Sequence, residues 1–290
     1  MTTKTFRQAV GLMIPVLLTL LLLLKAPQSS ALAGEAMQAA IRQVLPVLIP
    51  YCILSRMILA HLPASSGAHG RILTAYLTGA VCGAPVGAGL LAKLTEDGTL
   101  DRKEAERLLP SVCHTSPAFC AAVIGQTVGS TAVGAAMWCF SVLLGLPGLL
   151  SALKRAGGRT APAFTGPGGL GDAIRASSIM AGNVLCSILF FYTLSGTLMS
   201  WLRQSGLPAA IVSSLLEVSS GVLAAAALPA EFRCAVAAFA AVFGGLCVCA
   251  QVRAAVPGVS VLPYLIRKLT AGVIAAVLFY AFPSFFELFP

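Results

Sequence analysis

The residue best suited to chemistry is Glu217, a single carboxylate within the apolar run 207–228. A charged side chain inside a membrane costs about 2.5 kcal/mol or more, so it usually marks a substrate, ion or proton site. The hydroxyls of Ser219 and Ser220 follow it, and they could orient the carboxylate or contact a substrate directly. The alternatives are a structural tie between Glu217 and the backbone, or a place at the membrane interface.

A second polar cluster, His114, Thr115 and Ser116, precedes Pro117 in another apolar run. Proline removes a backbone hydrogen bond from a helix, and the three preceding side chains offer donors and acceptors at the break. A helix broken within a membrane presents partial charges to a ligand. The alternative is a kink that is satisfied internally. Gln251 ends a similar broken segment later in the chain, and we expect it at the same site.

The third candidate is a glycine- and proline-rich stretch in residues 82–89, which includes Gly83, Pro85 and Gly87. Such a stretch favours a broken helix or the tip of a hairpin. Irregular backbone is tolerated at membrane depth only where it is buried in protein or lines a cavity. We therefore assign these three residues to a substrate-contacting hairpin tip.

Enzyme motifs are weak by comparison. Residues 169–172 spell the GxGD word of intramembrane aspartyl proteases, but that chemistry needs two carboxylates sharing a proton. The other aspartates, Asp97 and Asp101, lie in an acidic loop, and Asp172 is better explained as the N-cap of a helix from Ala173. The nine cysteines lack the spacing of a metal site or disulfide framework. We expect no enzyme activity, no cofactor and no metal.

Composition identifies the environment that must position these residues. Only 10% of the 290 residues are charged and 58% are apolar, with a mean hydropathy of +0.90. That charge content is too low for a water-soluble surface, so the chain is expected to lie in the lipid bilayer. The net charge of +9 comes from basic residues at the edges of apolar runs, which is typical of membrane topology and not of a nucleic-acid surface.

Nine apolar segments are candidates for membrane helices. They are residues 9–24, 37–61, 72–92, 108–127, 131–153, 176–202, 207–228, 233–252 and 261–284. The first imitates a signal peptide, and we interpret it as a retained transmembrane helix. If every segment crossed, the basic loop 93–107 would lie outside the cell, against the positive-inside rule. A re-entrant hairpin at 72–92 instead places the basic loops 62–71, 93–107 and 154–175 in the cytoplasm.

The same reasoning predicts an all-α polytopic membrane protein built as an inverted repeat, with two re-entrant hairpins and two broken helices. We divide the chain into an N-terminal helix and short loop (1–36), a first repeat (37–153), a cytoplasmic connector (154–175) and a second, inverted repeat (176–290). The hairpin of the second copy is the segment 207–228. Its broken helix is the segment 233–252, which is interrupted at Gly244-Gly245.

Three blocks of residues resemble one known family. They are Gly83 to Ala88, Lys103 to Leu109 and Cys113 to Phe119, and their order and spacing resemble the YlbJ-type (SpoVV-like) sporulation integral membrane proteins of the nucleoside-recognition (Gate) superfamily. The stretches Val44 to Ser55, Leu216-Glu217 and Phe243 to Gln251 also look like the family, so the likeness covers nearly the whole chain. The chain departs from the family pattern at Cys113 to Pro117, where relatives carry a run rich in Asn and Ser.

The resemblance implies a carrier that moves dipicolinic acid into the developing forespore, across the outer forespore membrane of a sporulating bacterium. The expected partners are a small-molecule substrate and the bilayer, and a homo-oligomer is left open. Two alternatives remain, namely a nucleoside or other small-metabolite transporter of the same fold, and a non-transporting membrane scaffold for spore maturation. The expected substrate contacts are Gly83, Pro85, Gly87, His114, Thr115, Ser116, Glu217, Ser219, Ser220 and Gln251.

Overall fold

The computed structural model describes residues 3–61, 66–161 and 169–281, and within these ranges the chain is helical with no strand. Six of the described helices are long and apolar enough to cross a membrane. They are Ala26–His61, Arg102–Val128, Thr131–Ala156, Leu170–Leu202, Ala230–Ala255 and Leu262–Ala281. The expectation of an all-α chain is confirmed, and several of its helices are suited to a bilayer.

The elements follow one order twice. After α1 (Thr3–Leu24), the first series has α2 (Ala26–Ala39), a π-helical turn (Ala40–Val44), α3 (Leu45–His61), α4 (Gly67–Cys82), α5 (Ala84–Glu96), α6 (Arg102–Val112), α7 (Pro117–Phe119), a second π-helical turn (Cys120–Ile124), α8 (Gly125–Val128) and α9 (Thr131–Ala156). The second series has α10 (Leu170–Leu202), α11 (Gly206–Leu216), α12 (Val218–Ala225), α13 (Ala230–Phe243), α14 (Gly245–Ala255) and α15 (Leu262–Ala281). Each series is thus a long helix, a pair of short helices, a broken helix and a closing helix.

The short helices α4 and α5 fold back on each other at Gly83. In a continuous helix, residues eight apart would be separated by about 12 Å. Instead, a Cβ atom built on Gly79 would lie only 3.1 Å from the Cα atom of Gly87. Gly83 permits the reversal because its φ of 98° lies in a region that other residues rarely adopt.

Helices α11 and α12 reverse in the same way, with Glu217 between them. A Cβ atom on Gly221 would lie 2.5 Å from the Cα atom of Ser214, although seven residues of continuous helix would span about 10 Å. Both pairs are therefore helical hairpins whose arms approach closely through small residues.

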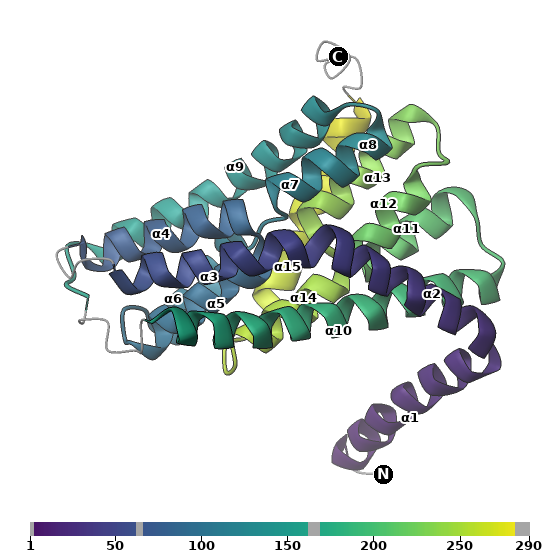
Figure 1. Cartoon of the computed structure of the whole chain (residues 1–290), viewed down its shortest axis with the longest axis horizontal. Coiled ribbons are helices and arrows are strands. Elements are labelled where there is room, and N and C mark those ends of the chain that lie inside the picture. The colour runs from purple at the N-terminus through teal and green to yellow at the C-terminus, as the bar shows by residue number, and fades with distance from the viewer. Residues whose placement is uncertain (1–2, 62–65, 162–168, 282–290) are drawn as a thin grey trace.

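The two series interlock in one body (Figure 1). The long helix α10 runs along α2 and α3, while α13 packs on α15 and α14 packs on α5. One apolar core joins Leu91 of α5, Leu108 of α6 and Val252 of α14. In the apolar window of Ala230–Ala255, 78% of the residues are buried, against 22% in that of Ala26–His61. The broken helix of the second series is therefore an inner element, and the long helix of the first is an outer one.

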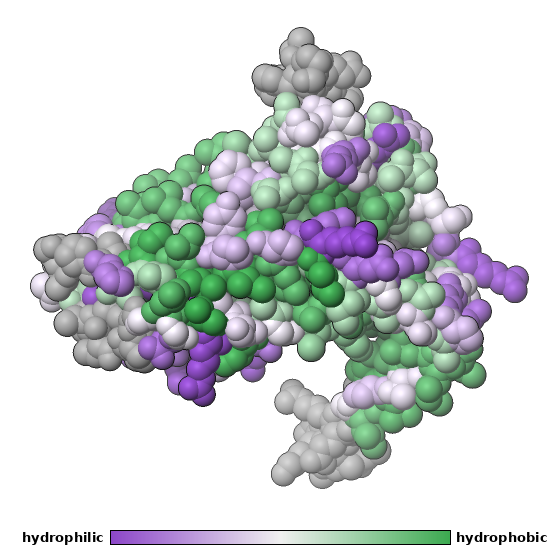
Figure 2. All heavy atoms as spheres, in the orientation of Figure 1, coloured by the Kyte–Doolittle hydropathy of each residue, from purple (hydrophilic) through white to green (hydrophobic). Residues whose placement is uncertain are grey.

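Outer helices carry exposed aliphatic side chains, as a lipid-facing surface requires. Examples are Leu54 on α3, Leu150 on α9 and Val277 on α15, all more than half exposed. Figure 2 shows a largely hydrophobic face in this view, with hydrophilic residues gathered near its ends and in a band across its middle.

Several local predictions are confirmed. The predicted helix interruptions occur at Gly83, at Cys113–Ser116 and at Gly244. Asp101 caps α6 by accepting a hydrogen bond from the N–H of Glu104 at 2.7 Å, and the Glu104 carboxylate accepts from the N–H of Asp101 at 3.0 Å. This reciprocal cap agrees with the sequence pattern at the start of that helix.

Two boundaries differ from expectation. The short loop expected before residue 37 is wrong, because Pro27 lies in the first turn of a helix that begins at Ala26, where its fixed φ is well suited. Asp172 is not an N-cap; α10 begins at Leu170, and Asp172 lies in its first turn, where an acid favours the helix dipole. Within the connector 154–175, residues 162–168 lie outside the described ranges, as do the last residues of segment 261–284.

The close hairpin arms give a stability prediction. Gly87→Ala places a methyl group against the Val112 carbonyl and near the Gly79 Cα, so we expect the free energy of unfolding to fall by about 1–3 kcal/mol through overpacking. The matched control is Gly182→Ala on the exposed side of α10, where a Cβ meets nothing within 4 Å. Thermal unfolding in detergent is the measurement, and equal midpoints for the two variants would contradict the described packing.

Candidate functional site

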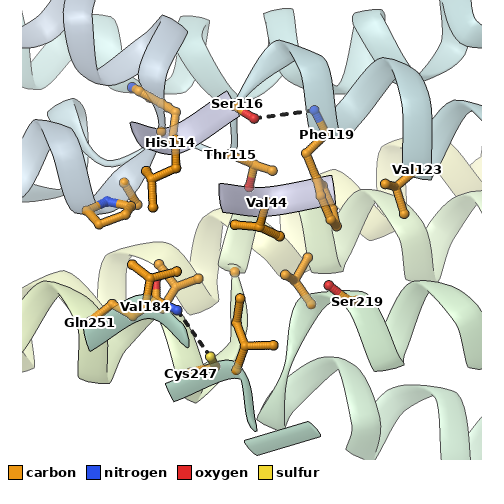
Figure 3. A pocket seen from close by; sticks show the side chains of 18 of the residues that line it. Val44, His114, Thr115, Ser116, Phe119, Val123, Val184, Ser219, Cys247 and Gln251 are labelled. Carbon is orange, nitrogen blue, oxygen red and sulfur yellow. Dashed lines mark hydrogen bonds between the residues drawn. The ribbon is translucent and has the colours of Figure 1, made fainter. Parts of the chain in front are cut away.

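A cavity of about 380 Å³ lies where the helix interruptions meet (Figure 3). Residues from both hairpin tips and both broken helices line it. Eight of the ten predicted site residues are in this lining, namely Gly83, Pro85, His114, Thr115, Ser116, Glu217, Ser219 and Gln251. The sequence therefore identified residues that lie far apart in the chain and meet around one space.

Two predicted contacts, Gly87 and Ser220, do not line the cavity. Gly87 lies against Gly79 and the Val112 carbonyl, so its lack of a side chain serves helix packing. Ser220 uses its hydroxyl within the hairpin, donating to the Glu217 carbonyl at 3.1 Å and to the Ser195 hydroxyl at 3.4 Å. Both residues build the hairpins without lining the cavity.

Glu217 has a structural bond and a place in the cavity lining. Its side chain is 1% exposed, and its Oε2 atom accepts a hydrogen bond from the Ser220 N–H at 2.7 Å, which caps α12. The positive end of the α12 dipole lies at this carboxylate and favours its negative charge. The structural tie that the sequence left as an alternative is therefore present, in a residue that also faces the cavity.

His114 and Thr115 satisfy the ends of broken helices. His114 donates through Nε2 to the Ser111 carbonyl at 2.6 Å, and its Nδ1 contacts the Ser141 hydroxyl at 3.1 Å. Thr115 donates from Oγ1 to the Ala241 carbonyl at 2.5 Å, which links the first broken helix to the second. Both side chains thus use most of their hydrogen-bonding groups within the protein, although each borders the cavity.

Ser116 caps the helix that restarts after the first break. Its Oγ accepts from the Phe119 N–H at 3.3 Å, and Pro117 occupies the first helical position, where a missing N–H carries no penalty. On the second broken helix, Gln251 donates from its amide nitrogen to the Cys247 sulfur at 3.3 Å. Sulfur is a weak acceptor, so the Gln251 amide keeps capacity for a ligand.

Helices α5 and α14 begin at the breaks without a side-chain cap. Their N-cap residues, Gly83 and Gly244, both line the cavity. An uncapped helix start exposes N–H groups and carries a partial positive charge. Two such starts beside one cavity favour an anionic ligand over a cationic one.

Lys268 is the main site residue that sequence reasoning missed. It lies on α15, is 5% exposed and lines the cavity with its neighbour Tyr264. Among the residues that the structure describes, none forms a hydrogen bond or ion pair with its ammonium group. The pair Arg267-Lys268 lies near the start of an apolar run, which is typical of residues that flank a membrane helix at the interface. The sequence signal that could have identified Lys268 as a site residue is its position several residues inside that run.

Arg42 and Gln43 were missed as well. They lie in the π-helical turn that interrupts the long helix Ala26–His61, and both line the cavity. Such turns are frequent at functional sites because they change the direction of side chains on a helix. The lining thus carries two basic groups, Lys268 and Arg42, and one acidic group, Glu217.

The arrangement suits a small polar ligand with negative charge. Apolar side chains such as Val44, Val184 and Phe119 enclose the space, while a few polar groups from different helices face it, which is typical of a small-molecule site (Figure 3). In the described part of the chain, no group of three or more His, Cys, Asp or Glu side chains is placed to hold a metal ion. No protein-family pattern, curated protein or solved structure matches the chain.

The lining predicts different accessibility for adjacent serines. In a variant without native cysteines, Ser219→Cys should react with a small water-soluble thiol reagent, because residue 219 faces the cavity. Ser220→Cys is the matched control and should react at least about tenfold more slowly, since residue 220 faces Ser195 instead. The rates can be measured by mass spectrometry. Similar rates for the two positions would contradict a lining that includes residue 219 and excludes residue 220.

Proposed function

We propose that the protein is a membrane carrier of the secondary type for a small organic anion, dipicolinic acid in a sporulating bacterium. The observation that carries the proposal is the buried Lys268, whose ammonium group has no partner among the described residues, in a cavity that both hairpin tips and both broken helices line. A buried ammonium without an internal partner is costly unless a ligand supplies the counter-charge. A catalytic role has no comparable support, so the proposal is transport.

The repeated order of elements supports an inverted repeat. A long helix, a hairpin that returns to its side, a broken helix and a closing helix make three crossings, so the second series would start from the opposite face. Carriers of this kind hold the substrate near the middle of the membrane, between discontinuous helices of both copies. The cavity lining draws on both series, as that arrangement requires.

The distribution of basic residues supports one orientation of this inverted repeat in the membrane. Hairpins that enter and leave on one side would place the basic segments 62–71, 93–107 and 154–175 together in the cytoplasm, in agreement with the positive-inside rule. The membrane would be the bacterial cell membrane and, under the sporulation proposal, the outer forespore membrane. The proposal does not depend on whether the protein is a monomer or a homo-oligomer.

The proposed binding mode uses the groups that the fold leaves uncommitted. Lys268 and the uncapped starts of α5 and α14 would hold the carboxylate groups of dipicolinate. The Gln251 amide would orient its pyridine ring. Glu217 is drawn toward the Ser220 N–H, which reduces its repulsion of an anion. Alternating access would follow from movement around the two hairpins, which expose the cavity to one side at a time.

Uptake into proteoliposomes tests the proposal. Lys268→Gln should raise the KM for dipicolinate about tenfold or more, because a charge-assisted hydrogen bond is worth about 1.5–3 kcal/mol. Lys268→Arg should restore part of the affinity. The matched control is Lys154→Gln, which removes an exposed lysine that does not line the cavity and should leave uptake unchanged.

Glu217→Gln provides a second variant in the same assay, because its amide oxygen can still cap α12 while the charge is lost. Altered uptake with normal insertion would support a role in transport, and unchanged uptake would remove Glu217 from the mechanism. Accumulation of uridine in place of dipicolinate would identify a nucleoside carrier. Absence of uptake, with spore maturation insensitive to Glu217 and Lys268 variants, would favour a scaffold.

Topology gives an independent prediction. In cells, a cysteine at Lys103 in a cysteine-free variant should be labelled by a membrane-impermeant maleimide only after permeabilisation, because loop 93–107 is cytoplasmic in the proposed orientation. The matched control is Gln204→Cys, at the opposite end of α10, which should be labelled in intact cells. Labelling of residue 103 from outside would exclude the re-entrant arrangement.

A further inference from the structure

A second cavity, of about 410 Å³, lies between α6, α9 and α15 and shares no lining residue with the central one. Three arginines line it, one from each helix: Arg107, Arg155 and Arg267. The single acid in the lining is Glu104. The positive-inside rule accounts for basic residues at these helix ends, but it does not require three guanidinium groups from three helices to line one cavity.

The positive charge of this cavity is not neutralised within the described protein. Glu104 is already engaged, because its carboxylate forms an ion pair with Arg159 at 2.7 Å and also caps α6. The guanidinium groups of Arg107 and Arg155 make no hydrogen bond to any residue that the structure describes. Arg267 donates one bond, to the Arg107 carbonyl at 3.1 Å, which holds it at the cavity and leaves its other N–H groups available.

The cavity also lies at the ends of apolar helices. Arg155 is in the last turn of α9, and Arg267 is near the start of α15. Exposed aliphatic side chains continue from it along both helices, with Leu150 on α9 62% exposed and Ile274 on α15 44% exposed. A ligand that fits both features needs an anionic head for the arginines and apolar chains for the helix surfaces.

We propose that this cavity binds the phosphate of an anionic phospholipid, such as phosphatidylglycerol, with its acyl chains along α9 and α15. Guanidinium groups match phosphate oxygens with paired hydrogen bonds, and basic pockets between membrane helices hold lipid headgroups in this way. The inference needs a bilayer but does not rest on the transport proposal, because the central cavity has no part in it.

The test uses the full chain, purified in a neutral detergent and titrated with dioctanoyl phosphatidylglycerol or dioctanoyl phosphatidylcholine, with binding followed by native mass spectrometry. We expect at least about tenfold tighter binding of phosphatidylglycerol. The triple variant Arg107→Gln, Arg155→Gln and Arg267→Gln should lose this preference. Each single variant should weaken binding about fivefold, which keeps the test decisive if the triple variant does not fold.

The matched control removes three basic residues near the same ends of the helices but outside the cavity: Lys103→Gln, Lys154→Gln and Arg175→Gln. It should keep the lipid preference within about twofold, since diffuse attraction is weak beside paired phosphate contacts. Equal losses in the two triple variants would overturn the site, as would an unchanged preference in the cavity variants. Equally tight binding of glycerol phosphate or dipicolinate through the same arginines would overturn its assignment to a lipid.

Discussion

The structure depends on one constraint: four helix interruptions lie inside an apolar molecule, and their backbone polar groups need partners there. An unpaired buried carbonyl costs free energy comparable to a lost hydrogen bond. Side chains from other elements meet this need. Trp138 donates to the Ala80 carbonyl near the end of α4 at 2.9 Å, and Thr115 donates to the Ala241 carbonyl near the end of α13. The same bonds that satisfy the breaks also hold the helices in register around the central cavity.

This constraint divides the polar residues of the centre into two groups. His114, Ser116 and Ser220 serve helix ends and hairpins, so their presence in an apolar run does not by itself indicate ligand binding. Lys268 has no such task within the described protein, and Gln251 has only a weak sulfur acceptor. The chemistry of the cavity therefore depends on fewer residues than line it, and a buried cation dominates its character.

The sequence predicted the interruptions because their causes are local. Gly83 permits a backbone that other residues rarely adopt, and Pro117 cannot continue a helix from the residue before it. Which residues line the cavity does not depend on local sequence. Gly87 resembled a tip residue but lies where two helices cross, and Lys268 resembled a flanking anchor but lies buried, because α15 packs against α13 and α6. Tertiary packing decides which face of a helix is inside, and the local residue pattern along one helix does not show it.

Adjacent residues on α15 connect the two charged cavities. Successive side chains on a helix point about 100° apart, so Lys268 reaches the central cavity while Arg267 reaches the arginine-lined one. A smaller cavity, of about 210 Å³, has both residues in its lining. The two charged cavities therefore share one helix, and a substitution that displaced α15 would disturb the linings of both.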